Sequence, residues 1–324
     1  MDTVYAALGD RVLVGDGTSG CDDCLLGHDI ECVAAGATEP ERVFVGSSDA
    51  GLQRTTNGGA TWETVLDAGE RVTSVTVSPH DAGVVWAGTE PSAVYRSTDG
   101  GETWTEKPGL TELDSAARWS FPPRPHTHHV RWLALAPDDP EQVFAAIEAG
   151  AFVRSPDGGE TWVDHPDGAQ RDNHTLATHP DAPDRVYAAA GDGFALSTDR
   201  GATWTHPQEG LARRYVWGLA VHPDDPDCAI VSAASGPRSA HSTRGESYVY
   251  RWDGDQWTQS MDGLPGPAGL ARPVLAADPD GGFLALTNHG LFQSKHGEAW
   301  VKQDLIDGDW TTKYDQVPSG LAVV

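Results

Sequence analysis

The chain has 324 residues, and its 48 Asp and Glu residues outweigh its 22 Lys and Arg residues to give a formal net charge of −26. This charge excludes nucleic acid and anionic membrane surfaces as expected partners. The hydrophobic fraction of 39% is enough for a large core, and no apolar run approaches the roughly 20 residues of a membrane span, so we expect a soluble protein. Because the first residues, MDTVYAALGD, lack the basic and apolar regions of a secretory signal, we expect a cytoplasmic location.

Within each sign of charge, one residue type predominates. Asp outnumbers Glu by 33 to 15, and Arg outnumbers Lys by 18 to 4. Such a surface repels itself in dilute buffer, whereas at molar salt the Debye length falls to about 3 Å and the repulsion largely disappears. The composition resembles that of cytoplasmic proteins from salt-accumulating haloarchaea and predicts a halophilic protein that folds in molar KCl. The alternative is an ordinary acidic protein that binds a basic partner.

One motif recurs along the chain and predicts its architecture. Clear copies are TTNGGATW, STDGGETW, SPDGGETW and STDRGATW, and weaker copies are YRWDGDQW and SKHGEAW. Their last residues are Trp62, Trp104, Trp162, Trp204, Trp257 and Trp300, at intervals of 42, 58, 42, 53 and 43 residues. A basal unit of this size matches the roughly 40 to 50 residues of a four-stranded propeller blade.

Each unit has the strand and turn pattern of such a blade. In RVTSVTVSPHDAGVVWAGTEPSAVYRSTDGGETWTEK, the β-rich runs VTSVTV, VVWAG, AVYRS and TWTEK alternate with turns rich in Pro, Gly, Asp and Ser. We therefore predict blades at about 28–67, 70–108, 130–165, 172–207, 214–260 and 272–304.

The two ends of the chain supply a further blade. The N-terminal TVYAALGDRVLVGD resembles the second and third strands of a unit, and the C-terminal VPSGLAVV resembles the first strand. Joining 317–324 with 1–24 closes the ring without exposed sheet edges. The predicted fold is an all-β, seven-bladed β-propeller that forms one domain over 1–324. A six-bladed ring with loose ends is the alternative.

The motif S-x-D-x-G-x-x-W resembles the Asp box of the BNR or Asp-box repeat family, and the resemblance covers nearly the whole chain. The repeat occurs in sialidases, xyloglucanases, sortilin-type receptors and photosystem assembly factors, so it implies a fold rather than an activity. We interpret the motif as scaffold, in which Asp accepts backbone N–H groups, Gly supplies a positive φ and Trp packs between blades. The structural residues are Asp99, Asp157, Asp199, Trp62, Trp104, Trp162, Trp204 and Trp300.

Two insertions account for the two longer intervals. PGLTELDSAARWSFPPRPHTHHV precedes the first strand of the third blade, and GPRSAHSTRGES joins the second and third strands of the fifth. Because successive strands alternate in direction, both insertions lie on the face opposite the Asp boxes. Loops elaborated on a rigid scaffold are where binding and catalysis concentrate, so we expect the functional site at this mouth of the channel.

Basic side chains gather at this mouth. The aligned blades place these residues at the starts of the innermost strands: His28, Arg71, His128, His129, Arg131, Asp172, His174, Arg213, Arg214, Tyr215 and Arg272. The aligned turns between second and third strands contribute Asp10, Glu90, Glu148, Asp192 and His289. The Arg and His residues predict a pocket for an anionic or hydroxyl-rich ligand, with Trp132 or Trp217 as a stacking surface. A water-filled channel that needs polar residues without any ligand is the alternative.

Two groups of residues suggest a divalent metal, although no cofactor is certain. The run PHTHH allows His126 and His128 to act with His129 or His174. The sequence CDDCLLGHDIEC gives a zinc-knuckle-like spacing of Cys21, Cys24, His28 and Cys32. The predicted topology argues against the second group, because it places the first two cysteines on an outer strand and the third on an inner one. Cys228 is interpreted as an apolar filler, and four cysteines imply no disulfide framework.

Two classes of function remain open. A sialidase-like site could be drawn from Arg71, Arg131, Arg213 or Arg272 with Tyr215, but sialidases are typically six-bladed, and the expected F-R-I-P motif is absent. Xyloglucanases, which the repeats also resemble, use a cleft between two propellers.

A carboxylate pair from Glu90, Glu148 or Asp192 leaves open a hydrolase acting on a glycoside or related ester, with or without a metal. We favour a non-enzymatic propeller, resembling the photosystem assembly factor and sortilin types, that binds a protein, a peptide or a small anionic or hydroxylated ligand.

Overall fold

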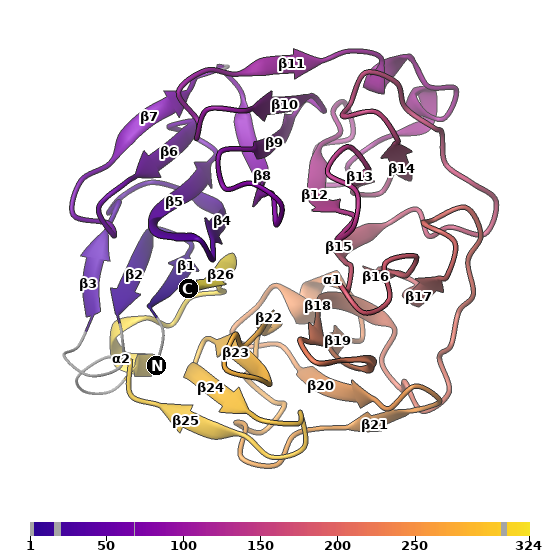
Figure 1. Ribbon diagram of the computed structural model, residues 1–324. Coiled ribbons are helices and arrows are strands. Elements are labelled where there is room, and N and C mark those ends of the chain that lie inside the picture. The colour runs from indigo at the N-terminus through magenta and orange to yellow at the C-terminus, as the bar shows by residue number, and fades with distance from the viewer. Residues whose placement is uncertain (1–2, 16–20, 68, 306–309) are drawn as a thin grey trace.

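Seven antiparallel sheets stand around a central channel as the blades of a propeller (Figure 1). The computed structural model describes residues 3–15, 21–67, 69–305 and 310–324. The sheets follow one another around the ring in chain order, with one strand of each at the channel and its last strand toward the rim. The prediction of an all-β, seven-bladed propeller is therefore confirmed.

Five blades contain four strands each. In four of these blades the strands lie across the sheet in sequence order, and the fifth is the blade made by the two ends of the chain. The first blade contains β4 Ile30–Gly36, β5 Glu39–Ser47, β6 Leu52–Thr55 and β7 Glu63–Leu66. The second contains β8 Arg71–Val77, β9 Val85–Glu90, β10 Val94–Ser97 and β11 Thr105–Lys107. The fifth contains β18 Tyr215–His222, β19 Asp225–Ala234, β20 Ser247–Trp252 and β21 Trp257–Gln259. The sixth contains β22 Val274–Ala277, β23 Phe283–Thr287, β24 Gly290–Ser294 and β25 Val301–Gln303.

The third and fourth blades differ from the four-stranded pattern expected from the sequence. They contain β12 Val130–Leu135, β13 Val143–Ile147 and β14 Ala151–Ser155, and β15 Asn173–Ala177, β16 Val186–Ala190 and β17 Gly193–Ser197. Their fourth strands are reduced to single bridges at Val163 and Thr205. The chain reaches Pro166 and Pro207 soon afterwards, and proline has no N–H to extend the ladder.

The seventh blade joins the two ends of the chain, as predicted. Its strands are β26 Gly320–Val323, β1 Val4–Leu8, β2 Arg11–Gly15 and β3 Cys21–Cys24. The C-terminal β26 takes the innermost place and pairs with β1 in register from Val4 opposite Val323 to Ala7 opposite Gly320. Every residue of β1 is buried. The closing blade is therefore part of the core.

The Asp box forms one compact hydrogen-bonded turn. In the fourth blade, Oδ1 of Asp199 accepts the Ser197 hydroxyl at 2.8 Å and the Thr203 N–H at 2.7 Å, while Oδ2 accepts the Thr203 hydroxyl at 2.6 Å. Gly201 has a φ of 78°, and its carbonyl accepts the indole N–H of Trp204 at 3.3 Å. In the boxes of Asp99, Asp157 and Asn57, the side-chain oxygen likewise accepts the N–H of the Thr four residues on. The motif is turn scaffold, as its composition indicated.

Aromatic rings connect neighbouring blades. The Asp-box Trp204 meets Phe152 of the preceding blade edge-on, with ring centroids 4.9 Å apart. Trp257 meets Phe194 in the same way at 4.9 Å. Both Phe side chains are fully buried. The hydrophobic core is thus a ring of clusters, each lying between two successive sheets.

The two insertions and the C-terminal segment hold the few helical turns of the described chain. These are the 3₁₀ turns η1 Leu110–Glu112 and η2 Ala116–Arg118 and the short helices α1 Pro237–Ala240 and α2 Trp310–Lys313. The first insertion packs buried Leu110 and Trp119 against the core of the third blade. It is therefore an anchored part of the fold. No described helix is long and apolar enough to cross a membrane.

Candidate functional site

A cavity of about 780 Å³ opens at the channel mouth that carries both insertions. Inner strands and the residues beside them form its wall, and both insertions form its rim. Its lining residues are Glu31, Arg71, Thr73, Phe121, Pro122, Pro123, Arg124, His129, Arg131, Glu148, Asp172, Tyr215, Trp217, Pro237, Arg238, His241, Arg272 and Ser319. The sequence predicted this face.

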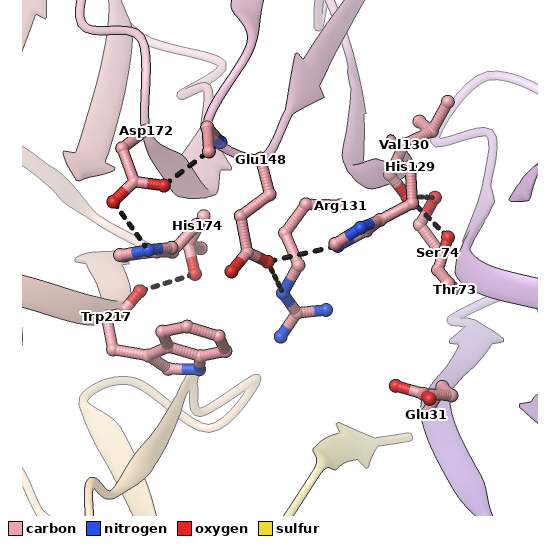
Figure 2. A network of polar contacts seen from close by, with 12 residues as sticks. Glu31, Thr73, Ser74, His129, Val130, Arg131, Glu148, Asp172, His174 and Trp217 are labelled. Atoms are coloured by element: carbon pink, nitrogen blue, oxygen red, sulfur yellow. Dashed lines mark hydrogen bonds and ion pairs between the residues drawn. The ribbon is translucent and has the colours of Figure 1, made fainter. Parts of the chain in front are cut away.

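β-Bulges in the inner strands position the central side chains. Five inner strands shift register at the same place, just after their first paired residues. The residues at these shifts are Glu31, Thr73, Arg131, His174 and Trp217. A bulge leaves a residue without its ladder partner and redirects its side chain. Figure 2 shows these five side chains gathered around one space.

Hydrogen bonds between blades hold the bulges in place. The Thr73 hydroxyl donates to the carbonyl of Val130 at 2.8 Å, and Ser74 donates to the same oxygen at 2.9 Å. Two blades further on, the Thr175 hydroxyl donates to the carbonyl of Trp217 at 2.8 Å. At these two bulges a backbone carbonyl accepts a hydrogen bond from the preceding blade, which preorganises this part of the wall.

Glu148 is the buried carboxylate at the centre of the site. It follows β13 directly, is 7% exposed, and its Oε2 accepts the Nε2–H of His129 at 3.0 Å. The Nε of Arg131 lies 3.6 Å from the same oxygen. Burial opposes the charged form of Glu148, but the His129 hydrogen bond and the charges of His174, His129 and Arg131 outweigh burial and lower its pKa to about 2. Glu148 is therefore an anion.

His174 and Asp172 lie beside Glu148 on the neighbouring blade (Figure 2). The Nδ1 of the fully buried His174 is 2.6 Å from the carbonyl oxygen of Val216, which can only accept, so Nδ1 carries the proton. Its Nε2 lies 3.7 Å from Oδ2 of Asp172. Burial lowers the pKa of His174 and raises that of Asp172.

Two arginines share one indole at the base of the cavity. The guanidinium carbons of Arg131 and Arg272 lie 4.8 Å and 4.3 Å from the ring centroid of Trp217. His174 stacks on the same indole at 4.3 Å, and His241 meets it edge-on at 4.4 Å. Burial and the charge of Arg131 lower the pKa of Arg272. Two adjacent buried cations make this part of the cavity electrostatically receptive to an anion.

A chain of ion pairs forms another side of the cavity. Arg71 pairs with Glu31 and lies 3.4 Å from Glu90, whose carboxylate also accepts the Nε–H of Arg124 at 2.6 Å. Burial raises the pKa of Glu90, but the hydrogen bonds and charge of Arg124 outweigh this and leave the pKa lowered. Arg71 and Arg124 also line a smaller neighbouring pocket of about 460 Å³, together with Glu90 and His126.

Other residues of the predicted site lie outside the large cavity. Arg213 pairs with Glu246 at 3.0 Å, and His28 pairs with Asp49 at 3.0 Å. Asp10 pairs with Arg11 and accepts a hydrogen bond from Gln316. Fully buried His174 lies behind the cavity wall, and Glu90 and His126 line the smaller pocket. The remaining predicted residues outside the cavity are exposed Asp192 and Arg214, His289 against the Gly269 carbonyl, Trp132 beside a neighbouring core cluster, and His128 against the Trp119 ring.

Neither predicted metal group comes together. Cys32 is buried with its Sγ against the Val72 carbonyl, whereas Sγ of Cys24 donates to the Gly59 carbonyl at 3.5 Å. Cys228 is buried, forms no disulfide among the described residues and packs in the core cluster that contains Phe283. Among the described residues, a single trio brings its metal-ligating atoms within 4.8 Å of one another, and it consists of Glu148, Asp172 and His174. It includes one predicted histidine with two acids that the metal interpretation had not used.

Sequence reasoning omitted several residues of the site. Glu31, Thr73 and Ser319 occupy the same repeat position as Arg131, visible in the aligned strings IECVA, VTSVT, VRWLA, NHTLA, VWGLA, ARPVL and PSGLA. The second residue of each string is equivalent to the residue at the bulge of the five strands that shift register, so strand alignment could have found Glu31, Thr73 and Ser319. Arg124, Arg238 and His241 belong to the insertions, which have no repeat to align.

The repeat family described as BNR/Asp-box repeat matches residues 95–106, which cover most of β10, the second Asp box and the start of β11. The chain is a seven-bladed β-propeller that contains a BNR/Asp-box repeat. A comparison of the propeller with curated proteins finds no match.

Solved propellers of two kinds resemble this one in structure. The GH74 enzyme of Niastella koreensis is 17% identical over 92% of this chain and 52% of its own, with a TM-score of 0.71. The GH74 xyloglucanase of Xanthomonas campestris is 16% identical over 99% of this chain and 53% of its own, with a TM-score of 0.62. A structure of YCF48 bound to D1 peptide is 19% identical over 86% of this chain and 82% of its own, with a TM-score of 0.57. The propeller thus spans about half the length of the GH74 chains, and at these identities the likeness shows the fold alone.

Proposed function

We propose that the propeller is a binding protein whose cavity takes an anionic ligand, namely a peptide segment with a free or side-chain carboxylate. The observation that carries the proposal is the sign of charge in the cavity. Five of the 18 arginines in the chain line it, against three acids, in a protein of net charge −26. Charge of this sign, opposite to that of the whole molecule, supports recognition of an anion.

The donors at the base of the cavity support the same proposal. Within the described chain, neither terminal nitrogen of Arg131 has a hydrogen-bond partner, although the residue is 7% exposed. Arg272 uses its Nε on His241 and one terminal nitrogen on the Pro318 carbonyl, which leaves its other terminal nitrogen free. Guanidinium groups with free forks bind carboxylates in a bidentate manner. The peptide in the YCF48 structure gives a precedent for peptide binding on a similar fold.

Calorimetric titration in molar KCl tests the proposal. The probes are an acidic hexapeptide with a free carboxyl terminus and the same peptide with Asp and Glu replaced by Asn and Gln and an amidated end. We expect the anionic probe alone to bind. Arg131→Met removes two free donors and a charge, so the Kd should rise about 10- to 150-fold, which corresponds to the roughly 1.5 to 3 kcal/mol of a charged hydrogen bond.

Arg214→Met is the matched control. It removes an exposed arginine near the same mouth that does not line the cavity. Unchanged binding in this variant distinguishes the cavity from general loss of positive charge. Equal binding of the two probes, or a folded Arg131→Met variant that binds as the wild type does, refutes the proposal.

A second candidate function, hydrolysis of a glycoside, is favoured by one observation. Oxygens of Glu148 and Asp172 lie within 4.8 Å of each other in the cavity wall. This separation is near the roughly 5 to 5.5 Å between the carboxyl groups of retaining glycosidases. The sequence analysis considered Glu90, Glu148 and Asp192 for such a pair, whereas the structure places Asp172 beside Glu148. GH74 enzymes are among the similar structures.

Turnover measurements separate the two functions. A panel of chromogenic glycosides is assayed in molar KCl with EDTA, so that bound metal does not contribute. Hydrolysis that is lost in Glu148→Gln and retained in Glu90→Gln supports the carboxylate pair. No turnover, together with binding of the anionic peptide, supports the binding protein.

A further inference from the structure

We propose that Glu148, Asp172 and His174 form a binding site for a divalent transition-metal ion in the wall of the cavity. The proposal goes beyond peptide binding, which needs no metal. It differs from both metal groups considered from the sequence, because two of its three ligands are carboxylates.

The separation of the three ligand atoms suits a cation. One atom from each residue lies within 4.8 Å of the other two. A point between three atoms so spaced is at most about 2.8 Å from each, against roughly 2.0 to 2.6 Å for divalent ions and their N and O ligands. Side-chain movements of less than about 1 Å therefore complete the coordination.

Each of the three side chains is fixed by a hydrogen bond at one atom and presents a second atom that can bind a cation. His174 donates its Nδ1–H to the Val216 carbonyl, so its Nε2 presents a lone pair, and this buried atom has no hydrogen-bond partner in the described chain. Asp172 accepts the Ala149 N–H at 3.0 Å with Oδ1, which leaves Oδ2 facing His174. Glu148 uses Oε2 on His129 and Arg131, which leaves Oε1. Metal-ligating histidines and carboxylates are oriented by outer hydrogen bonds of this kind.

The backbone supports the arrangement at two points. Ala149 has a φ of 51°, in the left-handed region that non-glycine residues rarely occupy, and this conformation directs its N–H to Asp172. His174 lies at the register shift of β15, which turns the ring away from the ladder and toward the acids. Backbone conformations that cost energy, such as that of Ala149, are found most often at functional sites.

The ligand set indicates the class of ion. Imidazole favours Zn²⁺ and other transition metals, carboxylates favour Mn²⁺, Mg²⁺ and Ca²⁺, and a mixed set of one imidazole and two carboxylates suits Mn²⁺ or Zn²⁺. Two carboxylates close together, one buried (Glu148) and one partly exposed (Asp172), are also stabilised by positive charge between them. Three protein ligands leave coordination positions open, as in metal sites that bind an external ligand. If the proposed peptide function holds, its carboxylate takes one of these positions beside Arg131.

Metal binding is measured directly, without a peptide or any activity. The wild-type chain is stripped with EDTA, dialysed into 2 M KCl to suppress general attraction to the acidic surface, and titrated with Mn²⁺ under EPR detection. We expect one ion per chain and a spin-echo signal from a coordinated nitrogen. Asp172→Asn, whose Oδ1 can still accept the Ala149 N–H, should weaken binding by about tenfold or more.

Two further variants make the result decisive. Glu148→Gln removes a second ligand and should weaken Mn²⁺ equally, with the fold checked by circular dichroism. Asp224→Asn removes an exposed acid on the opposite face and should bind as the wild type does. The proposal is overturned if no ion binds, if folded Asp172→Asn keeps the wild-type affinity, or if Asp224→Asn loses as much affinity as Asp172→Asn. Because no peptide is present, failure here leaves the anion-binding function standing.

Discussion

The contact between Trp204 and Phe152 gives a quantitative prediction about how the Asp box stabilises the ring. The two rings belong to adjacent blades and meet edge-on with centroids 4.9 Å apart. If the Asp-box Trp connects blades, the loss of unfolding free energy caused by replacing one of these side chains must depend on whether the other is present. The variants are Trp204→Ala, Phe152→Leu and the double variant.

The expected magnitudes follow from burial. Trp204 is half-buried, so its truncation forfeits about half of the roughly 1.5 to 3 kcal/mol that full burial confers, together with the roughly 0.5 to 1.5 kcal/mol of an aromatic pair. A loss of about 2 kcal/mol is expected. Phe152→Leu in the fully buried core costs about 1 to 1.5 kcal/mol and loses the same pair term. The double variant should therefore be more stable than additivity predicts, by about 0.5 to 1.5 kcal/mol.

Urea unfolding in molar KCl, followed by circular dichroism, measures the free energy of unfolding of each variant. The matched control combines Trp204→Ala with Phe283→Leu, which alters an equally buried Phe in the sixth blade. These two distant sites should be additive within about 0.5 kcal/mol. A coupling near zero for the Phe152 pair, or equal coupling for the control pair, refutes the role of the Trp as a connection between blades.

Two further predictions concern salt and thiol reactivity. The melting temperature should rise steeply from 0.1 to 2 M KCl, because the Debye length falls from about 10 Å to about 3 Å or less and the surface acids cease to repel one another; a flat profile contradicts the halophilic interpretation. Burial raises the pKa of Cys32 to about 12, so at pH 8 its thiol should resist labelling in the native protein and react only in denaturant. Mass spectrometry checks this, and labelling of native Cys32 as fast as half-buried Cys24 would contradict it.

The sequence determined the fold well because the fold repeats. An Asp, a Gly and a Trp at fixed spacing define a turn whose hydrogen bonds are local, so the pattern alone indicated the bonds that Asp99 and Asp199 accept. The missing fourth strands were harder to foresee, because the segments after Trp162 and Trp204 still resemble strands until Pro166 and Pro207 stop the ladder.

The site was predictable only as far as the repeat extends. Arg131, His174 and Trp217 were placed at the mouth because strand alignment fixes which face a residue reaches. Alignment did not show that a bulge turns each of them toward one centre, nor that Arg124 returns from an insertion to pair with Glu90. Such contacts join residues far apart in sequence, and no local pattern encodes them.

The net charge of −26 and the basic cavity act over different distances, and salt separates them. Exposed acids such as Asp138, Asp184 and Asp224 lie in turns on the opposite face and repel an approaching anion over a long range. The terminal nitrogens of Arg131 and the remaining terminal nitrogen of Arg272 act at contact inside a buried site, where screening is weak. Raising KCl therefore removes the repulsion before it weakens the attraction. We therefore expect the affinity for an anionic ligand to increase through the submolar range, opposite to the behaviour of an exposed ion pair.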